Sequence, residues 1–430
     1  MSSYQESLEY LYSLQKFGIK LGLDNITSLL KSLGNPEKGL KFIHMGGTNG
    51  KGSTAAILTS ILTTAGFRVG LFTSPHLHDF RERIRIGNQP ISPDRVVELT
   101  ARIKKALDEG GRVIPATFFE FNTAMALLYF FEAGVDLAVL EVGMGGRLDA
   151  TNVVDPLISI ITNISFDHTQ YLGKSLKEIA WEKLGIVKRG RPLIAGVDQP
   201  ELVLLFNERC RDMDSPLYLL GRDIDISETG GGRFEYKGIY IQHPDLMVSL
   251  PGRHQMINAA LALASVELLG REGFPVAPKH IRAGLMNVRW PGRLEHLPTT
   301  PLVILDGAHN PGGISALREA LRGYSYKNLI LVFGVMEDKD WPTMIADLAP
   351  LVKRVILTRP NLSRSCPPQL LREEARKNGL KGEVIESVAE AVAAALRRAG
   401  PEDIVLVTGS LFTVAEAREA LGVAPRPGQI

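Results

Sequence analysis

The glycine-rich segment at residues 46–54 constrains the fold more than any other part of the chain. A short apolar run at 42–45 leads into Gly46-Gly47-Thr48-Asn49-Gly50-Lys51-Gly52-Ser53-Thr54, and an alanine- and leucine-rich segment follows from residue 55. This order predicts a strand, a phosphate-binding loop and a helix, because glycines let backbone N–H groups surround an anion at a helix N-terminus. We expect Lys51 to reach the β- and γ-phosphates of a nucleotide, and Ser53 or Thr54 to offer a hydroxyl to Mg²⁺. A plain flexible turn is the alternative.

The loop departs from the usual P-loop pattern at two positions. Met45 stands where the first glycine is expected, and Gly52 stands where a Ser or Thr should follow the lysine. With these departures the segment resembles the phosphate loop of Mur-type amide ligases. Within that group it resembles folylpolyglutamate synthases, whose bacterial members are often also dihydrofolate synthases. The resemblance implies catalysis by Lys51 and ATP binding by Gly47, Thr48, Asn49, Gly50, Lys51, Gly52, Ser53 and Thr54.

Length and composition exclude several classes of protein. At 430 residues we expect two or three domains, at roughly 150 residues each. Lys plus Arg (49) nearly balances Asp plus Glu (47), so neither nucleic acid nor an anionic membrane is an expected partner. The two cysteines, Cys210 and Cys366, form no zinc or disulfide pattern, the N-terminus shows no signal pattern, and the longest apolar tract, 124–131, is too short to span a membrane. We therefore expect a soluble, cytoplasmic and monomeric protein.

The pattern of strands and helices predicts an α/β protein with two domains. Residues 1–290 are predicted to form a P-loop NTPase-like domain with a mainly parallel sheet. Prolines and glycines mark 291–301 as a linker, and alternating strands and helices in 302–430 predict a smaller Rossmann-like domain. The resemblance implies that the first domain binds ATP and the folate, and that the second binds glutamate and part of the nucleotide. Its strands are expected at 302–306, 329–334, 354–358, 383–386 and 403–408. Residues 217–250 alternate polar and apolar side chains, which predicts an antiparallel patch.

A second motif begins at Ser74-Pro75-His76-Leu77 and continues to residue 86. The arginines at 81, 83 and 85 recur with a period of two, which predicts that they share one face of a strand. A solvated charged face is the alternative. The segment is similar to the substrate loop of the ligase family, which implies that Ser74 lies near a magnesium ion and Arg83 near an anionic group of the substrate.

The segment 117–131 predicts an aromatic-rich helix. Aromatic side chains at this spacing usually belong to a core, and that interpretation stays open here. The resemblance instead implies that Phe118, Phe119 and Phe121 lie beside the pterin, since a flat heteroaromatic ring can stack on such side chains.

A buried strand is predicted at 136–142, and it ends beside Glu141. The glycines at 143–146 lack the G-x-G-x-x-G spacing, so a dinucleotide site is rejected. A carboxylate at the carboxyl end of a parallel strand near a P-loop is typical of an acid that holds Mg²⁺. The run 140–152 closely resembles the ligase family, which implies that Asp149 and Ala150 bind the substrate.

The Asp167-His168 pair could suggest a hydrolytic triad, but the chain contains no G-x-S-x-G nucleophile elbow. The resemblance implies that His168 is a catalytic metal ligand and that Lys183 matches a lysine that the family commonly carbamylates. The implied ligands of two Mg²⁺ ions, with Mn²⁺ as a substitute, are Ser53, Ser74, Glu141, His168 and carbamylated Lys183.

The resemblance extends through the C-terminal third. It implies that Asn258, Arg293 and Asp306 bind the nucleotide, and that His309 and Ser410 meet the incoming amino acid. For the run 306–313, a simple turn and helix cap at Asn310-Pro311 is the alternative.

Together these motifs predict an ATP-dependent ligase that adds L-glutamate to tetrahydrofolate through an acyl phosphate. Dihydropteroate as a second acceptor is left open. The expected partners are small molecules: a reduced folate or dihydropteroate, and L-glutamate. The alternatives are a Mur-type ligase with another acyl substrate, or a P-loop ATPase or kinase that acts on a macromolecule. Phosphate release that requires both a folate and glutamate would separate these possibilities.

Overall fold

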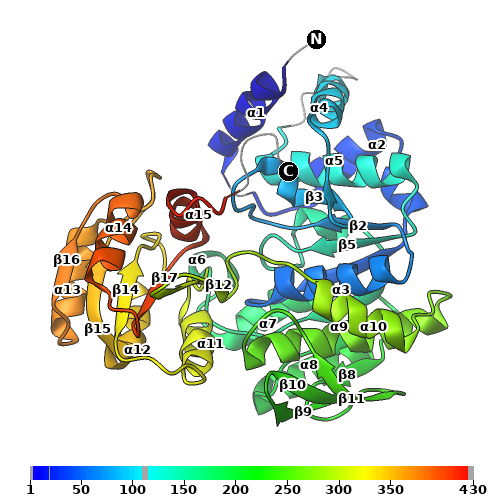
Figure 1. Ribbon diagram of the computed structural model, residues 1–430. Helices are drawn as coiled ribbons and strands as arrows, with labels where there is room; N and C mark the ends of the chain where they lie inside the picture. Colours follow the sequence, from blue (N-terminus) through cyan, green and yellow to red (C-terminus); the bar gives the residue numbers. More distant parts are fainter. Residues whose placement is uncertain (1–2, 19, 109–114, 425–430) are drawn as a thin grey trace. The chain divides into compact units, whose positions relative to one another are not determined.

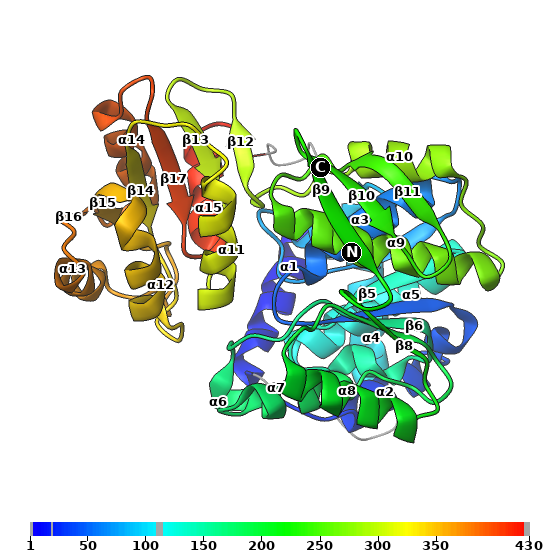
Figure 2. The ribbon, with the colours of Figure 1, turned by 90° about the horizontal axis from the view of Figure 1, so that it is seen from below.

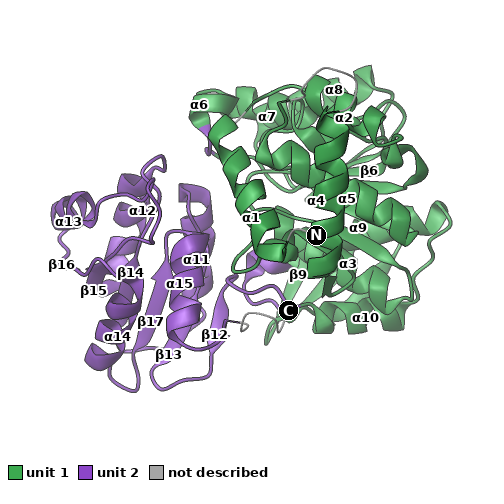
Figure 3. Ribbon diagram, turned by 90° about the horizontal axis from the view of Figure 1, so that it is seen from above, with its two compact units in different colours: residues 1–165, 169–249, 256–288 green, residues 166–168, 250–255, 289–430 purple. Residues whose placement is uncertain are grey.

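The computed structural model describes residues 3–18, 20–108 and 115–424. Contacts divide the chain into two units, shown in Figure 3: the first comprises 1–165, 169–249 and 256–288, and the second comprises 166–168, 250–255 and 289–430. The ends of the predicted domains, at 1–2 and 425–430, lie outside the described residues. The predicted domain limits and roles remain predictions. Within the predicted linker, β12 (Glu295–Leu297) pairs antiparallel with β13 (Leu302–Leu305).

The first unit is built around a mainly parallel sheet with the strand order β4-β3-β2-β5-β1-β6-β7-β8. The six neighbouring strands β2, β5, β1, β6, β7 and β8 pair in parallel, whereas β3 and β4 pair antiparallel at one edge of the sheet. The strands are β1 (Phe42–Gly46), β2 (Val69–Phe72), β3 (Ile84–Ile86), β4 (Gln89–Pro90), β5 (Leu137–Glu141), β6 (Pro156–Ile161), β7 (Leu193–Ala195) and β8 (Leu217–Leu219). Every residue of β1 and β5 is buried, as expected for central parallel strands.

Helices cover both faces of this sheet. The helices of the first unit are α1 (Tyr4–Ser13), α2 (Asp24–Ser32), α3 (Lys51–Thr64), α4 (Pro93–Asp108), α5 (Phe118–Ala133), α6 (Thr169–Leu172), α7 (Leu176–Leu184), α8 (Pro200–Asp212), α9 (Arg253–Arg271, which begins in the second unit) and α10 (Pro278–Asn287). Figure 1 shows α5 on one side of β2 and β5, and α3 with α10 on the other. Most residues of α3 and α5 are buried on all sides of the helix, because other elements surround both helices.

A separate antiparallel sheet follows β8. It consists of β9 (Asp225–Gly230), β10 (Arg233–Lys237) and β11 (Gln242–Met247), and Figure 2 shows it beside α9. The prediction of an antiparallel patch in 217–250 is therefore confirmed.

The prediction that Arg81, Arg83 and Arg85 share a strand face is wrong. Phe80–Arg83 forms a 3₁₀ turn, and β3 begins only at Ile84. The Asp79 carboxylate accepts the Arg81 N–H at 2.8 Å, and the Glu82 carboxylate accepts the Asp79 N–H at 2.9 Å. These side chain–backbone hydrogen bonds form a capping box, which competes with an extended backbone and overrides the period-two pattern.

The second unit has its own mainly parallel sheet, in the order β12-β13-β17-β14-β15-β16. Its further strands are β14 (Leu329–Phe333), β15 (Val352–Leu357), β16 (Gly382–Val384) and β17 (Ile404–Thr408). Its helices are α11 (Pro311–Leu321), α12 (Trp341–Leu348), α13 (Pro368–Lys377), α14 (Val388–Arg398) and α15 (Leu411–Ala420). The predicted α/β fold, a P-loop sheet followed by a smaller Rossmann-like sheet, is confirmed. None of the described helices combines the length and apolarity needed to cross a bilayer.

We predict that two glycine-to-alanine changes in the first unit have opposite effects. A Cβ on Gly284 of α10 would lie 2.5 Å from Ile61 Cα in α3, so Gly284→Ala should destabilise the protein by about 1–3 kcal/mol. Among the described residues, no atom outside the adjoining backbone of α9 lies within 4 Å of the Cβ position of Gly270, so Gly270→Ala should stabilise the protein by up to about 1 kcal/mol. Urea denaturation checks both; equal effects would contradict the close packing of α3 and α10.

Candidate active site

The phosphate loop joins β1 to α3 and has room only for glycine at its first bend. Gly47 has a φ of +135°, and a Cβ there would lie 1.9 Å from Thr162 Oγ1. Gly50, with a φ of +84°, is the N-cap of α3, whose first residue is Lys51. The helix N-terminus therefore stands directly behind the loop, which is the arrangement that favours a bound phosphate.

Residues after β6 hold this loop in shape. Thr48 N donates to Asn163 O at 3.0 Å, and Asn49 N donates to Asn163 Oδ1 at the same distance. Thr162 Oγ1 donates to Asn49 O at 2.6 Å. Sequence reasoning did not assign Thr162 or Asn163 to the site. The sequence offers one weak indication for these two residues. They are polar and come directly after β6, a buried strand that neighbours β1.

Two lysines meet at one backbone carbonyl of the loop. Lys51 Nζ donates to Gly47 O and Thr48 O at 3.1 Å each. Lys183 Nζ, from α7, donates to the same Gly47 O at 2.9 Å, although its side chain is buried. The structure therefore brings two of the predicted catalytic residues together at the start of the phosphate loop.

Two of the predicted metal ligands of the first unit, Glu141 and Ser74, lie at the carboxyl ends of neighbouring strands. Glu141, at the end of β5, is paired with Met45 of β1, and its Oε2 accepts the Ser74 N–H at 3.0 Å. Ser53 is buried in the first turn of α3. Carboxylate and hydroxyl oxygens are hard ligands that suit Mg²⁺ or Mn²⁺. No group of three or more His, Cys, Asp or Glu side chains in the described residues has a metal-binding arrangement, so the predicted ligand set depends on serine and lysine as well.

Asn258, predicted to bind the nucleotide, lies against the phosphate loop. A Cβ on Gly50 would be 2.4 Å from Asn258 Oδ1, so the α9 residue closes over the N-cap of α3. This proximity requires glycine at position 50 for a second reason besides its backbone conformation.

Arg83 and Phe118 lie together in a cluster of aromatic rings. The Arg83 guanidinium lies 5.2 Å from the centre of the Phe118 ring, and its Nε donates to His76 Nδ1 at 2.7 Å. Tyr12 stacks on Phe118 with ring centres 5.8 Å apart. Burial lowers the pKa of Arg83 to about 10 and that of His76 to about 3, so at neutral pH the arginine is charged and the histidine is neutral. The Nη atoms of Arg83 form no hydrogen bond with the described residues and remain available to an anion.

The three predicted phenylalanines occupy different surroundings. Phe118 faces Arg83, and Phe119 covers Gly143, where a Cβ would lie 2.6 Å from the Phe119 ring. Phe121 is fully buried and packs edge-on against Tyr10. Phe118 is thus the best placed of the three to stack on a ligand, whereas the surroundings of Phe121 are those of the core.

Asp149 is buried, and its carboxylate organises the loop between β5 and β6. Its Oδ1 accepts from Thr151 N at 3.0 Å and Thr151 Oγ1 at 2.6 Å, while Oδ2 accepts from Met144 N at 2.9 Å. Burial raises the pKa of Asp149, and these hydrogen bonds oppose the rise. Ala150 begins the 3₁₀ turn that Asp149 caps.

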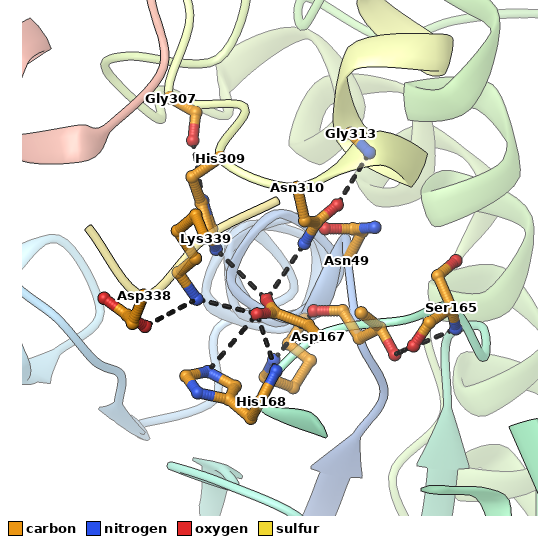
Figure 4. A network of polar contacts seen from close by, with 12 residues as sticks. Asn49, Ser165, Asp167, His168, Gly307, His309, Asn310, Gly313, Asp338 and Lys339 are labelled. Carbon is orange, nitrogen blue, oxygen red and sulfur yellow. Dashed lines mark hydrogen bonds and ion pairs between the residues drawn. The ribbon is translucent and has the colours of Figure 1, made fainter. Parts of the chain in front are cut away.

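In the second unit, Asp167 is the centre of a polar network, shown in Figure 4. Its carboxylate pairs with Lys339 Nζ at 2.6 Å and with His309 Nε2 at 3.5 Å, and accepts from Asn310 Nδ2 at 3.0 Å. Burial opposes its ionisation, but the His309 hydrogen bond and the Lys339 charge hold the pKa of Asp167 well below its ordinary value. The predicted residue His168 follows directly, with a φ of +50°, and its N–H donates to Asp167 Oδ1 at 2.8 Å.

Asn310 also forms the helix cap that was the alternative interpretation of this segment. It is the N-cap of α11, and its Oδ1 accepts the Gly313 N–H at 2.8 Å. Its amide nitrogen donates to Asp167, so one side chain serves both the helix cap and the network.

Arg293 and Asp306, both predicted to bind the nucleotide, are neighbours. A Cβ on Gly307 would lie 2.4 Å from Arg293 Nη1, and Asp306 accepts the N–H groups of Leu294 and Ala308 at 2.8 and 2.9 Å. Burial lowers the pKa of His254, with the charge of Asp306 opposing the shift and that of Arg293 adding to it, which places His254 in the same group.

Ser410 lies at the carboxyl end of β17. It is the N-cap of α15, and its Oγ accepts from Phe412 N at 3.0 Å and Thr413 N at 3.3 Å. The predicted amino-acid contact at Ser410 is therefore a buried helix cap in the structure.

Sequence reasoning missed Lys339 and Asp167 as partners, and it missed His254. Lys339 lies in a loop after β14, and no local pattern connects it with Asp167, which is 172 positions earlier. For Lys339 and Asp167 the signal was position, since both follow the carboxyl ends of parallel strands, whereas His254 lies in α9 and carried no such signal.

Family models match both parts of the chain. The Mur ligase middle domain matches residues 45–266, and the glutamate ligase domain of Mur ligases matches residues 292–411. Together with the phosphate loop and the two parallel sheets, these matches define the chain as a Mur-type ligase.

Similar proteins narrow this class. The Bacillus subtilis "Dihydrofolate synthase/folylpolyglutamate synthase" is 36% identical over 98% of this chain and 99% of that protein. A Haloferax volcanii protein, "Probable bifunctional folylpolyglutamate synthase/dihydropteroate synthase", is 39% identical over 96% of this chain, which spans about half (50%) of that relative. The chain belongs to the folylpolyglutamate synthase/dihydrofolate synthase family.

Solved structures agree. Escherichia coli FolC in complex with DHPP and ADP superimposes with a TM-score of 0.90 at 33% identity, covering 98% of both chains. A bifunctional folylpolyglutamate synthase/dihydrofolate synthase with Mn, AMPPNP and L-glutamate bound gives a TM-score of 0.87 at 32% identity, again covering 98% of both chains.

We predict that the Asp167–Lys339 pair stabilises the second unit. Lys339→Met leaves a buried carboxylate without its cation and should cost about 3 kcal/mol at pH 7. Because the folded-state pKa of Asp167 is depressed, its contribution is present above the unfolded value of 3.8 and is lost as the pH falls below it. The difference in stability between the two proteins, measured by urea denaturation, should therefore narrow towards acid pH.

The exposed Arg318–Asp347 pair provides the control. Its atoms are 3.6 Å apart at the surface, so Arg318→Met should cost less than about 1 kcal/mol. Equal losses for the two variants would contradict the role of the buried pair.

Proposed function

We propose that the chain is an ATP-dependent ligase that joins L-glutamate to the carboxylate of a reduced folate. The observation that carries this proposal is the phosphate loop with Lys51 and Lys183 on one carbonyl, in a chain whose relatives of this family match it from end to end. Dihydropteroate is the second acceptor to be tested, because the B. subtilis relative is described as a synthase of both kinds.

The reaction needs activation because a carboxylate has no usable leaving group. A carboxylate oxygen of the folate attacks the γ-phosphorus of ATP, and ADP leaves. The resulting acyl phosphate is attacked by the glutamate amine, inorganic phosphate departs with the transferred oxygen, and the amine nitrogen loses a proton. Each step brings anions together, so positive charge and hydrogen-bond donors must already be in place.

The first unit supplies those groups for the first step. The loop N–H groups and the α3 N-terminus bind the triphosphate, and Lys51 exchanges its carbonyl contacts for phosphate oxygens. Glu141, Ser53 and Ser74 are the oxygen ligands for divalent cations, which would neutralise the phosphates. Relatives solved with ADP, or with Mn and AMPPNP, support the use of ATP and a divalent metal.

We place the acyl substrate beside Arg83 and Phe118. The ring of Phe118 offers a stacking surface, and the buried guanidinium offers two free nitrogens to a carboxylate. His76, neutral and hydrogen-bonded to Nε, fixes the direction of that guanidinium.

In the second unit, Arg293 and Asp306 would bind the nucleotide, and His309 and Ser410 the incoming glutamate. His309 Nδ1 donates to Gly307 O at 2.9 Å, so its ring is oriented by the loop after β13 while Nε2 faces Asp167. An imidazole held in this way can pair with a carboxylate of the amino acid.

We further propose that Lys183 is carbamylated in the active enzyme. In the unmodified chain, two lysine nitrogens contact the same Gly47 oxygen and lie within about 6 Å of each other, so like charges repel inside a buried site. Reaction of the neutral Lys183 amine with CO₂ forms an N–C bond, releases a proton and replaces one positive charge with a negative one. The two new oxygens are ligands suited to Mg²⁺.

Lys51→Ala should lower kcat by at least roughly 10²–10³ because it removes a preorganised charge-stabilising donor. The measurement is glutamate incorporation into tetrahydrofolate, with Lys38→Ala as control, since that lysine is exposed outside the site. The variant should fold normally. Ligation near the wild-type rate would remove the phosphate loop from the mechanism.

The carbamate is tested by chemical rescue. Lys183→Ala should lose most of its ligase activity and regain part of it with added acetate or formate, whose carboxylate can fill the vacant position. Lys183→Arg keeps the charge but cannot form this carbamate, so it should be equally impaired. Lys177→Arg, exposed on the same helix, is the matched control. Normal ligation by Lys183→Arg would mean that Lys183 acts only as a cation.

A further inference from the structure

A buried histidine connects the strand that enters the phosphate loop with the loop that carries Asp149. His44 lies in the middle of β1, between Leu140 of β5 and Ser159 of β6, and its side chain is fully buried. Its Nε2 is 2.8 Å from Thr151 Oγ1, across 107 positions of sequence. The mechanism described above does not use this contact.

The direction of the hydrogen bonds in this chain follows from the Asp149 carboxylate. Asp149 accepts backbone N–H groups on both oxygens, so as a carboxylate it can only accept from Thr151 Oγ1 at 2.6 Å. The Thr151 hydroxyl proton is therefore committed to Asp149, and Thr151 Oγ1 must accept from His44. This requires a proton on Nε2 of His44, as in the Nε2–H tautomer of a neutral imidazole.

Two observations agree with a neutral ring of that tautomer. His44 Nδ1 is buried and has no hydrogen-bond partner among the described residues, which suits a nitrogen without a proton better than an N–H group. Burial, followed by the charge of Lys188, lowers the pKa of His44 to about 3.

We propose that His44 is a positioning residue for the loop between β5 and β6, acting through Thr151 on Asp149. This inference rests on the proposed function and on the expectation from the sequence that Asp149 and Ala150 bind the acyl substrate. The chain of hydrogen bonds fixes the carboxylate that caps the 3₁₀ turn at Ala150–Val153, and it ties this turn to β1, whose next residues form the phosphate loop. His44 itself touches no substrate.

A merely structural buried histidine would behave differently. Its substitution would lower the stability of the protein, or would change the KM for the folate and the KM for ATP alike. A positioning residue should instead raise the KM for the folate while the KM for ATP stays the same, because the phosphate loop keeps its own hydrogen bonds to Thr162 and Asn163.

The tautomer is measured by ¹⁵N NMR on the full chain labelled at histidine, with His44→Gln identifying the signal. We expect a protonated Nε2 and an unprotonated Nδ1 at pH 7. A protonated Nδ1 would overturn the proposal. This readout does not depend on activity, so it remains decisive even if the wild-type chain ligates no glutamate to any folate, an outcome that would reject the proposed function alone.

Kinetics test the consequence. Thr151→Val removes the hydroxyl at nearly constant volume and should raise the folate KM by roughly 10-fold, since two buried hydrogen bonds are lost and the His44 donor is left unpaired. Thr151→Ser retains the hydroxyl and should recover most of the loss. His44→Gln keeps a donor near Nε2 and should be affected less than His44→Leu.

Ser159→Ala is the matched control for lost stability. Ser159 is buried on β6 opposite His44 and donates to Ile186 O at 2.9 Å, outside the Asp149 loop. It should lower the stability of the protein without changing the folate KM. If Thr151→Val and Ser159→Ala shift the folate KM equally, or if neither shifts it, the positioning role is overturned.

Discussion

The arrangement of the phosphate loop and its two lysines depends on the Gly47 carbonyl. Two lysines from different helices donate to it, and the backbone turn that exposes it is open only to glycine, because Thr162 occupies the space of a side chain. A substitution there would displace the loop, both lysines and the start of α3 together. The chemistry of phosphate binding is therefore a consequence of one backbone turn and its packing.

Parallel strands explain why residues far apart in sequence meet around that turn. β1, β2, β5 and β6 are adjacent in the sheet, and their carboxyl ends deliver the phosphate loop, Ser74, Glu141 and the Thr162–Asn163 segment to one edge. The second unit repeats the principle, since Asp306, Lys339 and Ser410 follow β13, β14 and β17. Strand order, rather than local sequence, thus determines which side chains act together.

The sequence was sufficient to predict those features that depend on a single strand, helix or loop. The phosphate loop, Glu141 at its strand end and the parallel strands of the second unit were predictable, because apolar runs and glycines act locally, whereas the edge strand β12 fell within the predicted linker. It was insufficient at the turn Phe80–Arg83, where a capping box of Asp79 and Glu82 overrides a strand-like alternation. It was also silent on the pairs Asp167–Lys339 and His44–Thr151, since each joins residues more than a hundred positions apart. Such contacts arise only once the sheet is assembled.

In the proposed mechanism, a folate carboxylate is activated by direct transfer of the ATP γ-phosphoryl group. The most direct measurement uses a folate substrate labelled with ¹⁸O in the reacting carboxylate, together with ATP, Mg²⁺ and L-glutamate. Mass spectrometry of the released inorganic phosphate should then find one ¹⁸O atom per product formed, because the acyl oxygen leaves with phosphorus. Phosphate free of ¹⁸O, with glutamate nevertheless incorporated, would contradict the account.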